Sequence, residues 1–192
     1  MRARLRKHAR RMRVIIYRET LLDTKEHFWT FLGAFVGIGL IGLLNRYQLP
    51  PADAPLLIGS FGASSVLIYG VINSPLAQPR NLVGGHVLSA LIGVTMYRLL
   101  PSELWLSGAL AVALAIVGMQ ITKTLHPPGG ATALVAVIGS PQLKALGYGY
   151  VLVPVLSGVL ILLAVALVFN NITTSRCYPA NKNWYRFWQR GW

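Results

Sequence analysis

The chain has 192 residues, of which 54% are hydrophobic and only 12% are charged, whereas a soluble domain carries about 25% charged residues. This composition excludes an ordinary soluble globular protein and indicates a single domain in a membrane. The net charge of +13 does not indicate a nucleic-acid binder, because the Lys and Arg residues flank apolar segments and do not cover a folded face.

The two ends of the chain are basic. Residues 1–26 carry nine of the 18 Lys and Arg residues, and the apolar residues among them indicate either a short interfacial helix on the cytoplasmic side or a frayed tail. Residues 171–192 form a basic and aromatic tail, which is typical of a membrane interface. The predicted transmembrane domain lies between them, over residues 27–170.

Six apolar segments follow one another in this domain: Phe28–Tyr47, Pro55–Ile72, Leu82–Leu99, Glu103–Thr122, Pro127–Gly139 and Gly147–Phe169. A spanning helix needs about 20 apolar residues, with a range of roughly 17–25, so five segments are long enough. The fifth is too short to span ideally and could thin the bilayer, extend through Leu146, or enter and turn back. The fold class predicted is an all-α transmembrane helical bundle.

Six spans, or four spans with two re-entrant segments, both place the two ends of the chain on one side. By the positive-inside rule the arginine-rich ends make that side the cytoplasm. We therefore predict a multi-pass protein of a bacterial inner membrane, whose partner is the lipid bilayer and not nucleic acid; a homo-oligomer is left open. Cys177 is the single cysteine, so an intrachain disulfide is excluded.

The domain contains an apparent internal repeat, with halves at about 27–100 and 103–170. Gly62–Ser64 corresponds to Gly130–Thr132, and Ser74-Pro75 corresponds to Ser140-Pro141. Further matches join Leu82–Leu88 to Leu146–Leu152 and Leu91–Val94 to Leu156–Val159. Two related three-segment halves that each cross three times would be inverted relative to each other, which we favour; re-entrant segments would make them parallel.

The run Leu125–Ala131 is the sharpest motif. Pro127 and Pro128 predict a helix start, since proline suits the first turn of a helix. Gly129 and Gly130 leave that turn bare of side chains, so that its free N–H groups and the helix dipole would favour a small anion. The alternative is that these glycines only permit close helix packing.

Two polar stretches in the first half are further candidates. Ser60, Ser64 and Ser65 could bind a polar solute, or they could bond their own backbone or a neighbouring helix. The connection from Asn73 to His86 is polar and stiffened by two prolines, and its Arg80 could attract an anion or act only as a topology anchor.

The sequence gives no sign of catalysis or of a cofactor. His86 and His126 are the only histidines near membrane depth, and no carboxylate lies inside an apolar segment, since Glu103 only begins one. We therefore predict hydrogen-bonding roles and no metal site. Ser60 with His86 lacks both a nucleophile elbow and an orienting acid, so we predict that the protein is not an enzyme.

With these motifs the chain resembles the HPP family of integral membrane proteins. The resemblance rests on His126–Pro128 with Gly130–Leu134, on Pro55–Ser64 and on Ser74–His86, and it covers roughly residues 27–170. Gly129 departs from the family pattern, which more often has Ala there. The family is described as transmembrane and transporting, and some plant and cyanobacterial members are associated with nitrite; this resemblance, not the composition, implies nitrite as a substrate.

The function predicted is transport of a small inorganic anion through a site between the two halves. The alternatives are an anion channel, a carrier of another small solute, or a membrane scaffold without transport. The residues predicted to bind substrate are Ser60, Gly62, Ser64, Arg80, Asn81, His86, His126, Pro127, Pro128, Gly129, Gly130 and Thr132.

Overall fold

The computed structural model describes residues 24–48 and 54–180, which form helices and turns without strands. The elements are α2 (Thr24–Gln48), α3 (Ala54–Ser65), η1 (Val66–Gly70), η2 (Pro75–Ala77), α4 (Pro79–Leu99), α5 (Leu104–Ile121), α6 (Pro128–Ile138), α7 (Pro141–Ala145), η3 (Val151–Leu156) and α8 (Ser157–Phe169). The predicted all-α transmembrane fold class is confirmed. The interfacial helix and aromatic tail predicted for the chain ends fall largely outside the described residues.

Within the residues that the structure describes, four helical stretches are long and apolar enough to cross a membrane: Thr24–Leu44, Pro79–Leu99, Leu104–Ile121 and Val151–Phe169. Five were predicted, and the second segment is not among these four, because α3 has only 12 residues before the wider turns of η1 continue it to Gly70. α6 is short, as predicted, with 11 residues. Helix α4 starts earlier than predicted, because Pro79 occupies its first turn and does not belong to a loop.

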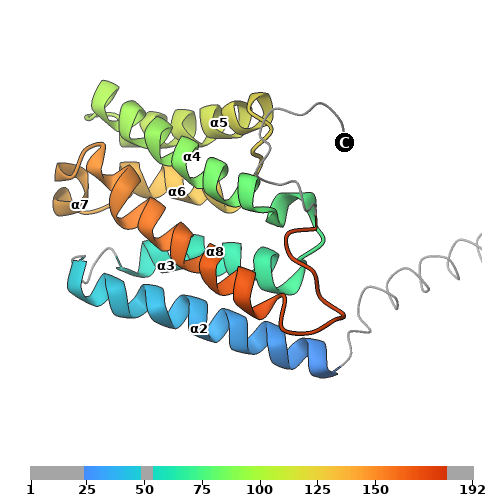
Figure 1. Cartoon of the computed structure of the whole chain (residues 1–192). Coiled ribbons are helices and arrows are strands. Elements are labelled where there is room, and N and C mark those ends of the chain that lie inside the picture. The colour runs from blue at the N-terminus through green and yellow to red at the C-terminus, as the bar shows by residue number, and fades with distance from the viewer. Residues whose placement is uncertain (1–23, 49–53, 181–192) are drawn as a thin grey trace, which may run out of the picture.

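The helices run between two ends of the molecule (Figure 1), and both ends have polar contacts. At one end, Arg176 contacts Glu26 and Tyr69, and the Tyr178 hydroxyl donates to the Ala77 carbonyl. At the opposite end, Thr95 and Tyr148 share a hydrogen bond between their hydroxyls. Successive helices alternate in direction between these ends, so that the start of α2 and the segment after α8 lie at the same end, which we call the terminal end.

The third helix of each predicted half packs against the first two helices of the other half. Helix α4 packs with α5 and α6, whereas α8 packs with α2 and α3. Figure 1 shows these two layers, with α4, α5 and α6 above α2, α3 and α8. The halves are therefore intertwined, and α3 meets α6 between the layers.

Two glycines at matching places in the predicted halves let each third helix, α4 and α8, pack against the other half. A Cβ atom at Gly93 of α4 would overlap the Ala133 carbonyl oxygen of α6, and one at Gly158 of α8 would lie 2.6 Å from the Phe61 ring of α3. Such close helix approach is typical of membrane bundles, in which van der Waals packing replaces the hydrophobic effect between helices. These matching contacts support the repeat, which stays a prediction.

A buried arginine fastens the segment after α8 to the terminal end. Arg176 is 5% exposed and donates to Asn170 Oδ1 at 2.8 Å, to the Tyr69 carbonyl at 2.7 Å and to the Glu26 carboxylate at 3.2 Å. Burial lowers the pKa of the Arg176 guanidinium, and the charge of Glu26 opposes this shift. The arginine thereby joins α2, η1 and α8 where they leave the membrane.

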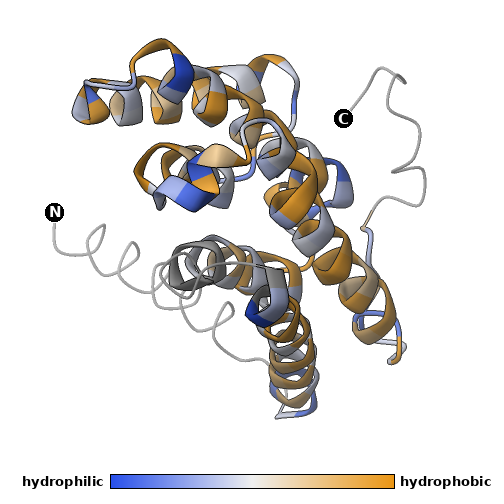
Figure 2. Ribbon diagram, turned by 90° about the vertical axis from the view of Figure 1, so that its left-hand side faces the viewer, coloured by the Kyte–Doolittle hydropathy of each residue, from blue (hydrophilic) through white to orange (hydrophobic). Residues whose placement is uncertain are grey.

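The outer surface is apolar along the helices. Figure 2 shows mainly hydrophobic colouring on the outer ribbons. Large apolar side chains are exposed there, including Phe31 and Phe35 of α2, which are 64% and 66% exposed. In water such a surface would be unfavourable, whereas in a bilayer it contacts lipid chains.

We predict that labelling of single cysteines separates the two ends of the molecule. Cys177 and a cysteine at Lys123 are exposed at the terminal end and should react from the same side of the membrane. In a Cys177→Ser background, a cysteine at Ser102, exposed between α4 and α5, should react only from the other side. Membrane-impermeant maleimide on oriented vesicles measures this, and reaction of Ser102→Cys from the Cys177 side contradicts the topology.

We also predict that Gly93→Ala lowers the thermal stability of the purified protein, while Gly42→Ala does not. The Gly93 substitution forces a methyl group against the α6 backbone, and overpacking costs about 1–3 kcal/mol. At Gly42 of α2 an added Cβ meets no atom within 4 Å, so its helix propensity alone should change. Equal melting temperatures for the two variants in detergent would exclude the close α4–α6 contact.

Candidate substrate site

Five polar side chains form a buried network where α3, α4 and α6 meet. We call it the central network, and its members are between 0% and 1% exposed: Ser60, Ser64, His86, His126 and Thr132. Two come from α3, one from α4, one from α6 and one from the turn before α6. Buried polar and ionisable side chains at membrane depth are rare and typically functional, so this network is the primary candidate site.

The Ser64 hydroxyl lies between the two histidines. Its Oγ is 2.8 Å from His86 Nε2 and 2.9 Å from His126 Nε2, and the imidazole centroids are 5.0 Å apart. On its other side, His126 Nδ1 lies 2.8 Å from the Leu76 carbonyl oxygen of η2. One serine thus joins both imidazoles in a single chain of hydrogen bonds.

The chain continues from His86 into α6. His86 Nδ1 lies 2.7 Å from Thr132 Oγ1, which lies 2.7 Å from Ser60 Oγ. Ser60 is also within 3.1 Å of the Pro128 carbonyl. Tyr150, just before η3, donates its hydroxyl proton to the Thr132 carbonyl at 3.0 Å, so that a tyrosine covers this end of the network.

One set of directions satisfies every hydrogen bond in this chain, and it starts from a fixed acceptor at the His126 end. The Leu76 carbonyl only accepts, so Nδ1 of His126 carries a proton and Nε2 of the neutral ring accepts from Ser64. Ser64 then accepts from Nε2 of His86, whose Nδ1 accepts from Thr132. Thr132 accepts from Ser60, and every proton in the neutral network is therefore donated.

Glycines let the two sequence motifs meet. A Cβ atom at Gly85 would lie 2.6 Å from His126 Cβ, and one at Gly129 would lie 2.7 Å from Ser89 Oγ and 3.0 Å from the Gly85 carbonyl oxygen. The backbones of α4 and of the start of α6 can approach only because these positions lack side chains. The glycines beside His86 and after His126 are therefore needed to place both imidazoles in one network.

Of the other predicted site residues, Arg80 and Asn81 lie apart from the network, toward the terminal end. Arg80 donates to the Thr122 carbonyl at 2.6 Å and Asn81 donates to the Leu125 carbonyl at 2.8 Å. Both side chains hold the turn that carries His126. Their direct contact with substrate stays a prediction, while the structure gives them a positioning role.

Gly62 and Gly130 also point away from the network. A Cβ at Gly62 meets no atom within 4 Å, and one at Gly130 has only Val112 at 3.8 Å. Gly130 and the exposed Pro127 line an apolar groove beside α5, together with Ile116 and Leu134. The open space over Gly130 is therefore not the anion approach that we expected from the sequence.

The expectation of free N–H groups in the first turn of α6 was wrong. The N–H group of Gly129 donates to the His126 carbonyl at 2.8 Å, and that of Gly130 donates to the Pro127 carbonyl at 3.0 Å. The tight turn before Pro128 supplies these acceptors from the chain itself. Pro128 instead contributes its carbonyl oxygen, which accepts from Ser60.

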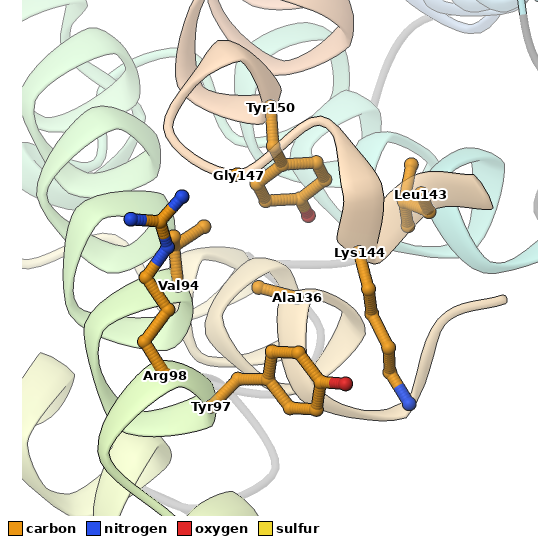
Figure 3. Close-up of a pocket in the computed structure, with 8 residues that line it drawn as sticks. All are labelled: Val94, Tyr97, Arg98, Ala136, Leu143, Lys144, Gly147 and Tyr150. Carbon is orange, nitrogen blue, oxygen red and sulfur yellow. The ribbon is translucent and has the colours of Figure 1, made fainter. Parts of the chain in front are cut away.

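A second polar feature lies on the side of Tyr150 that faces the end opposite the terminal end. It is a cavity of about 110 Å³, which we call the cationic pocket, lined by Val94, Tyr97, Arg98, Ala136, Leu143, Lys144, Gly147 and Tyr150. Figure 3 shows Arg98 and Lys144 flanking it, with Ala136 between them. Each cation also lies 4.8 Å from a tyrosine ring centroid, Arg98 from Tyr148 and Lys144 from Tyr97.

The cationic pocket and the central network share a wall. Tyr150 lines the pocket with its ring and bonds Thr132 with its hydroxyl, and Ala136 lies one turn beyond Thr132 on α6. Gly147 has φ +52°, and a side chain there would overlap the Arg98 guanidinium. This glycine therefore permits both the turn and the position of Arg98 at the pocket.

Sequence reasoning missed Arg98, Lys144 and Tyr150 as site residues. One feature of the sequence could have indicated the first two. Arg98 and Lys144 lie near connections at the end opposite the basic termini, where the positive-inside rule predicts few Lys and Arg residues. Tyr150 was visible as the counterpart of His86 in the repeat, and the structure places both against Thr132.

The comparisons with known proteins identify one family model and two transmembrane relatives. The family model for the HPP transmembrane region matches residues 19–179, which includes Arg176 and exceeds the 27–170 expected from the sequence. Two transmembrane proteins of Dictyostelium discoideum are 47% and 46% identical over 165 and 162 residues, covering 84% and 82% of this chain. The chain spans 58% and 51% of the length of these curated relatives. No solved structure matches.

We predict that Ser64→Ala destabilises the protein and that Ser65→Ala, its neighbour on α3, does not. Loss of the Ser64 hydroxyl leaves Nε2 of both buried histidines without their shared partner, at a cost of about 1–3 kcal/mol. The Ser65 hydroxyl is buried with no hydrogen-bond partner among the described residues, so its removal should be neutral or stabilising. Thermal unfolding in detergent compares the two, and an unchanged melting temperature for Ser64→Ala would contradict the network.

Proposed function

The chain belongs to the HPP transmembrane family, and from the geometry of its site we propose that it transports a small inorganic anion, with nitrite as the first candidate. The observation that carries this proposal is the adjacency of the cationic pocket and the central network, which share Tyr150. A cation at a pocket attracts an anion, and neutral polar groups deeper in the protein can replace its lost water.

The cationic pocket suits the capture of a small anion from water. Arg98 is exposed, whereas Tyr150 behind it is 1% exposed. The cavity of about 110 Å³ exceeds the roughly 10–15 Å³ that one water needs, so a small hydrated anion has room. The tyrosine rings under Arg98 and Lys144 hold both cations beside the cavity, and the described residues that line it include no carboxylate that would neutralise them.

The central network favours a carrier over an open channel. Its side chains are fully buried and bonded to one another, so an anion cannot pass without separating Ser60, Thr132 or Ser64 from a partner. The exchanged third helices and the alternating directions fit an inverted repeat, in which two layers move around a shared site. We infer cytoplasmic termini from the basic ends, so that the cationic pocket faces the other side.

The alternative hypothesis, a membrane scaffold without transport, is supported by the close glycine contacts of α4 and α8. These contacts account for the packing but not for five buried polar side chains, which a scaffold would replace with apolar ones at no loss. We therefore place transport first, and no catalytic step is part of the proposal.

We predict that purified protein in liposomes takes up nitrite and that Arg98→Gln and Lys144→Gln each lower the initial rate about five- to tenfold, equivalent to roughly 1–1.4 kcal/mol. Arg46→Gln is the matched control, because Arg46 is an exposed cation in the last turn of α2 that does not line the pocket. Stopped-flow uptake with an internal nitrite indicator measures the rates.

Three results would contradict the proposal in different ways. Uptake equal to that of protein-free liposomes would favour the scaffold. A rate that rises linearly with nitrite concentration would favour a channel. Equal losses in Arg46→Gln and Arg98→Gln would mean that the general surface potential attracts the anion and that the cationic pocket is not its entrance.

A further inference from the structure

The central network has enough donors and acceptors to hold one additional proton. In its neutral form the donated protons run from Ser60 through Thr132, His86 and Ser64 to His126, and end at the Leu76 carbonyl. In this pattern Ser60 donates to Thr132 and not to the Pro128 carbonyl, although that carbonyl lies 3.1 Å from Ser60 Oγ and could accept its proton. A second complete pattern therefore exists, with the bonds between His126 and Ser60 reversed.

We propose that the central network is a proton site, which takes up one proton from water with each anion that the protein transports and passes it between His86 and His126 through Ser64. The proposal rests on the proposed anion transport. It assigns the coupling ion of that transport and the side chains that carry it.

The transfer balances in atoms and charge. A proton from a hydronium ion binds Nδ1 of His86, which until then accepted from Thr132, and His86 becomes an imidazolium. Its Nε2 proton then passes to Ser64 Oγ while the Ser64 hydroxyl proton passes to Nε2 of His126. Two bonds to hydrogen break and two form, and the positive charge moves over the 5.0 Å between the rings.

The final pattern is again fully bonded. His126 donates from Nδ1 to Leu76 and from Nε2 to Ser64, and Ser64 donates to Nε2 of His86. His86 donates from Nδ1 to Thr132, Thr132 donates to Ser60, and Ser60 donates to the Pro128 carbonyl. No side chain changes place, so the network accommodates the proton without breaking the contact of α3 with α4 and α6.

The surroundings limit the network to one proton. His86 faces Phe61 and Ser64 of α3 and Thr132 of α6. Tyr150, just before η3, lies beyond Thr132. The two acids in the described part of the chain are engaged elsewhere, Glu26 with Arg176 and Glu103 with the Trp105 indole. Two imidazolium rings 5.0 Å apart would repel each other without a compensating carboxylate.

The charge of one proton fits the charge of one monovalent anion. Arg98 and Lys144 balance an anion at the cationic pocket, but they stay there when the anion moves on. In the buried region the described residues offer no further cation beside the network except a protonated histidine, since Arg80 is held at Thr122. A proton on His86 or His126 thus lowers the cost of moving the anion past Tyr150.

The proton site can be tested without a variant by nitrogen NMR of ¹⁵N-histidine-labelled protein in lipid nanodiscs. We expect the His86 and His126 rings to shift together on acidification, with one common midpoint and one proton in total. His27, exposed in α2 and outside the network, serves as an internal reference for the labelled rings. Uptake of two protons, or no change in either ring between about pH 4 and 8, would overturn the proton site.

The coupling is tested in liposomes that contain a pH indicator, with protein-free liposomes to subtract the leak of nitrous acid through lipid. An inward nitrite gradient should acidify the lumen by one proton per nitrite, and a pH gradient of one unit should raise nitrite accumulation about tenfold. His126→Gln should reduce the nitrite-driven acidification at least tenfold, whereas His27→Gln should leave it unchanged.

The two experiments separate failure of this inference from failure of the proposed function. Nitrite uptake through the protein without acidification would overturn proton coupling and leave anion transport standing. Absence of any nitrite uptake would overturn the proposed function, and the NMR titration would then decide the proton site alone. Acidification that persists in folded His126→Gln protein would exclude the His86–Ser64–His126 relay.

Discussion

The structure depends on one constraint: polar side chains inside a bilayer must find their partners within the protein, because no water is there to replace them. Ser64 meets this constraint for two imidazoles at once. Its position fixes α3 against α4 and against the turn before α6, and the glycines at 85 and 129 then follow as the places where these backbones can approach closely enough. The hydrogen bonds and the helix packing are therefore two aspects of the same arrangement.

Charge and polarity are divided along α6. The permanent cations, Arg98 and Lys144, lie at the pocket, where water reduces the cost of a charge. The buried centre holds hydroxyl and imidazole groups, which can be neutral when no ion is present. Tyr150 separates the two regions and contacts both. An ion that enters from the pocket would thus contact the permanent cations first. It would contact the hydroxyl and imidazole groups only afterwards.

Much of this arrangement could be predicted from the sequence. Helix positions follow from apolar length, and Ser60, Ser64, His86, His126 and Thr132 stood out as polar residues beside or within apolar segments. The side of a helix that a residue faces could not be predicted in this way. Gly129 and Gly130 were therefore predicted alike, although only a Cβ at Gly129 would meet the neighbouring backbone closely. The acceptors for the Gly129 and Gly130 N–H groups come from the turn before Pro128, which the sequence does not reveal. Arg98 and Lys144 are far apart in the sequence, and only the turn at Gly147 places both at one pocket.

The exchange of third helices has a consequence for biosynthesis. Helix α4 finds α5 and α6 among the next segments to leave the ribosome, whereas α2 and α3 pack with α8, which is made only after α4, α5 and α6. Until α8 is inserted, the face of α2 and α3 that it will cover therefore contacts only lipid or the insertion machinery. The layer whose synthesis begins first is therefore completed after the other one. Arg176, just beyond α8, can bond Glu26 only when the segment after α8 reaches the start of α2.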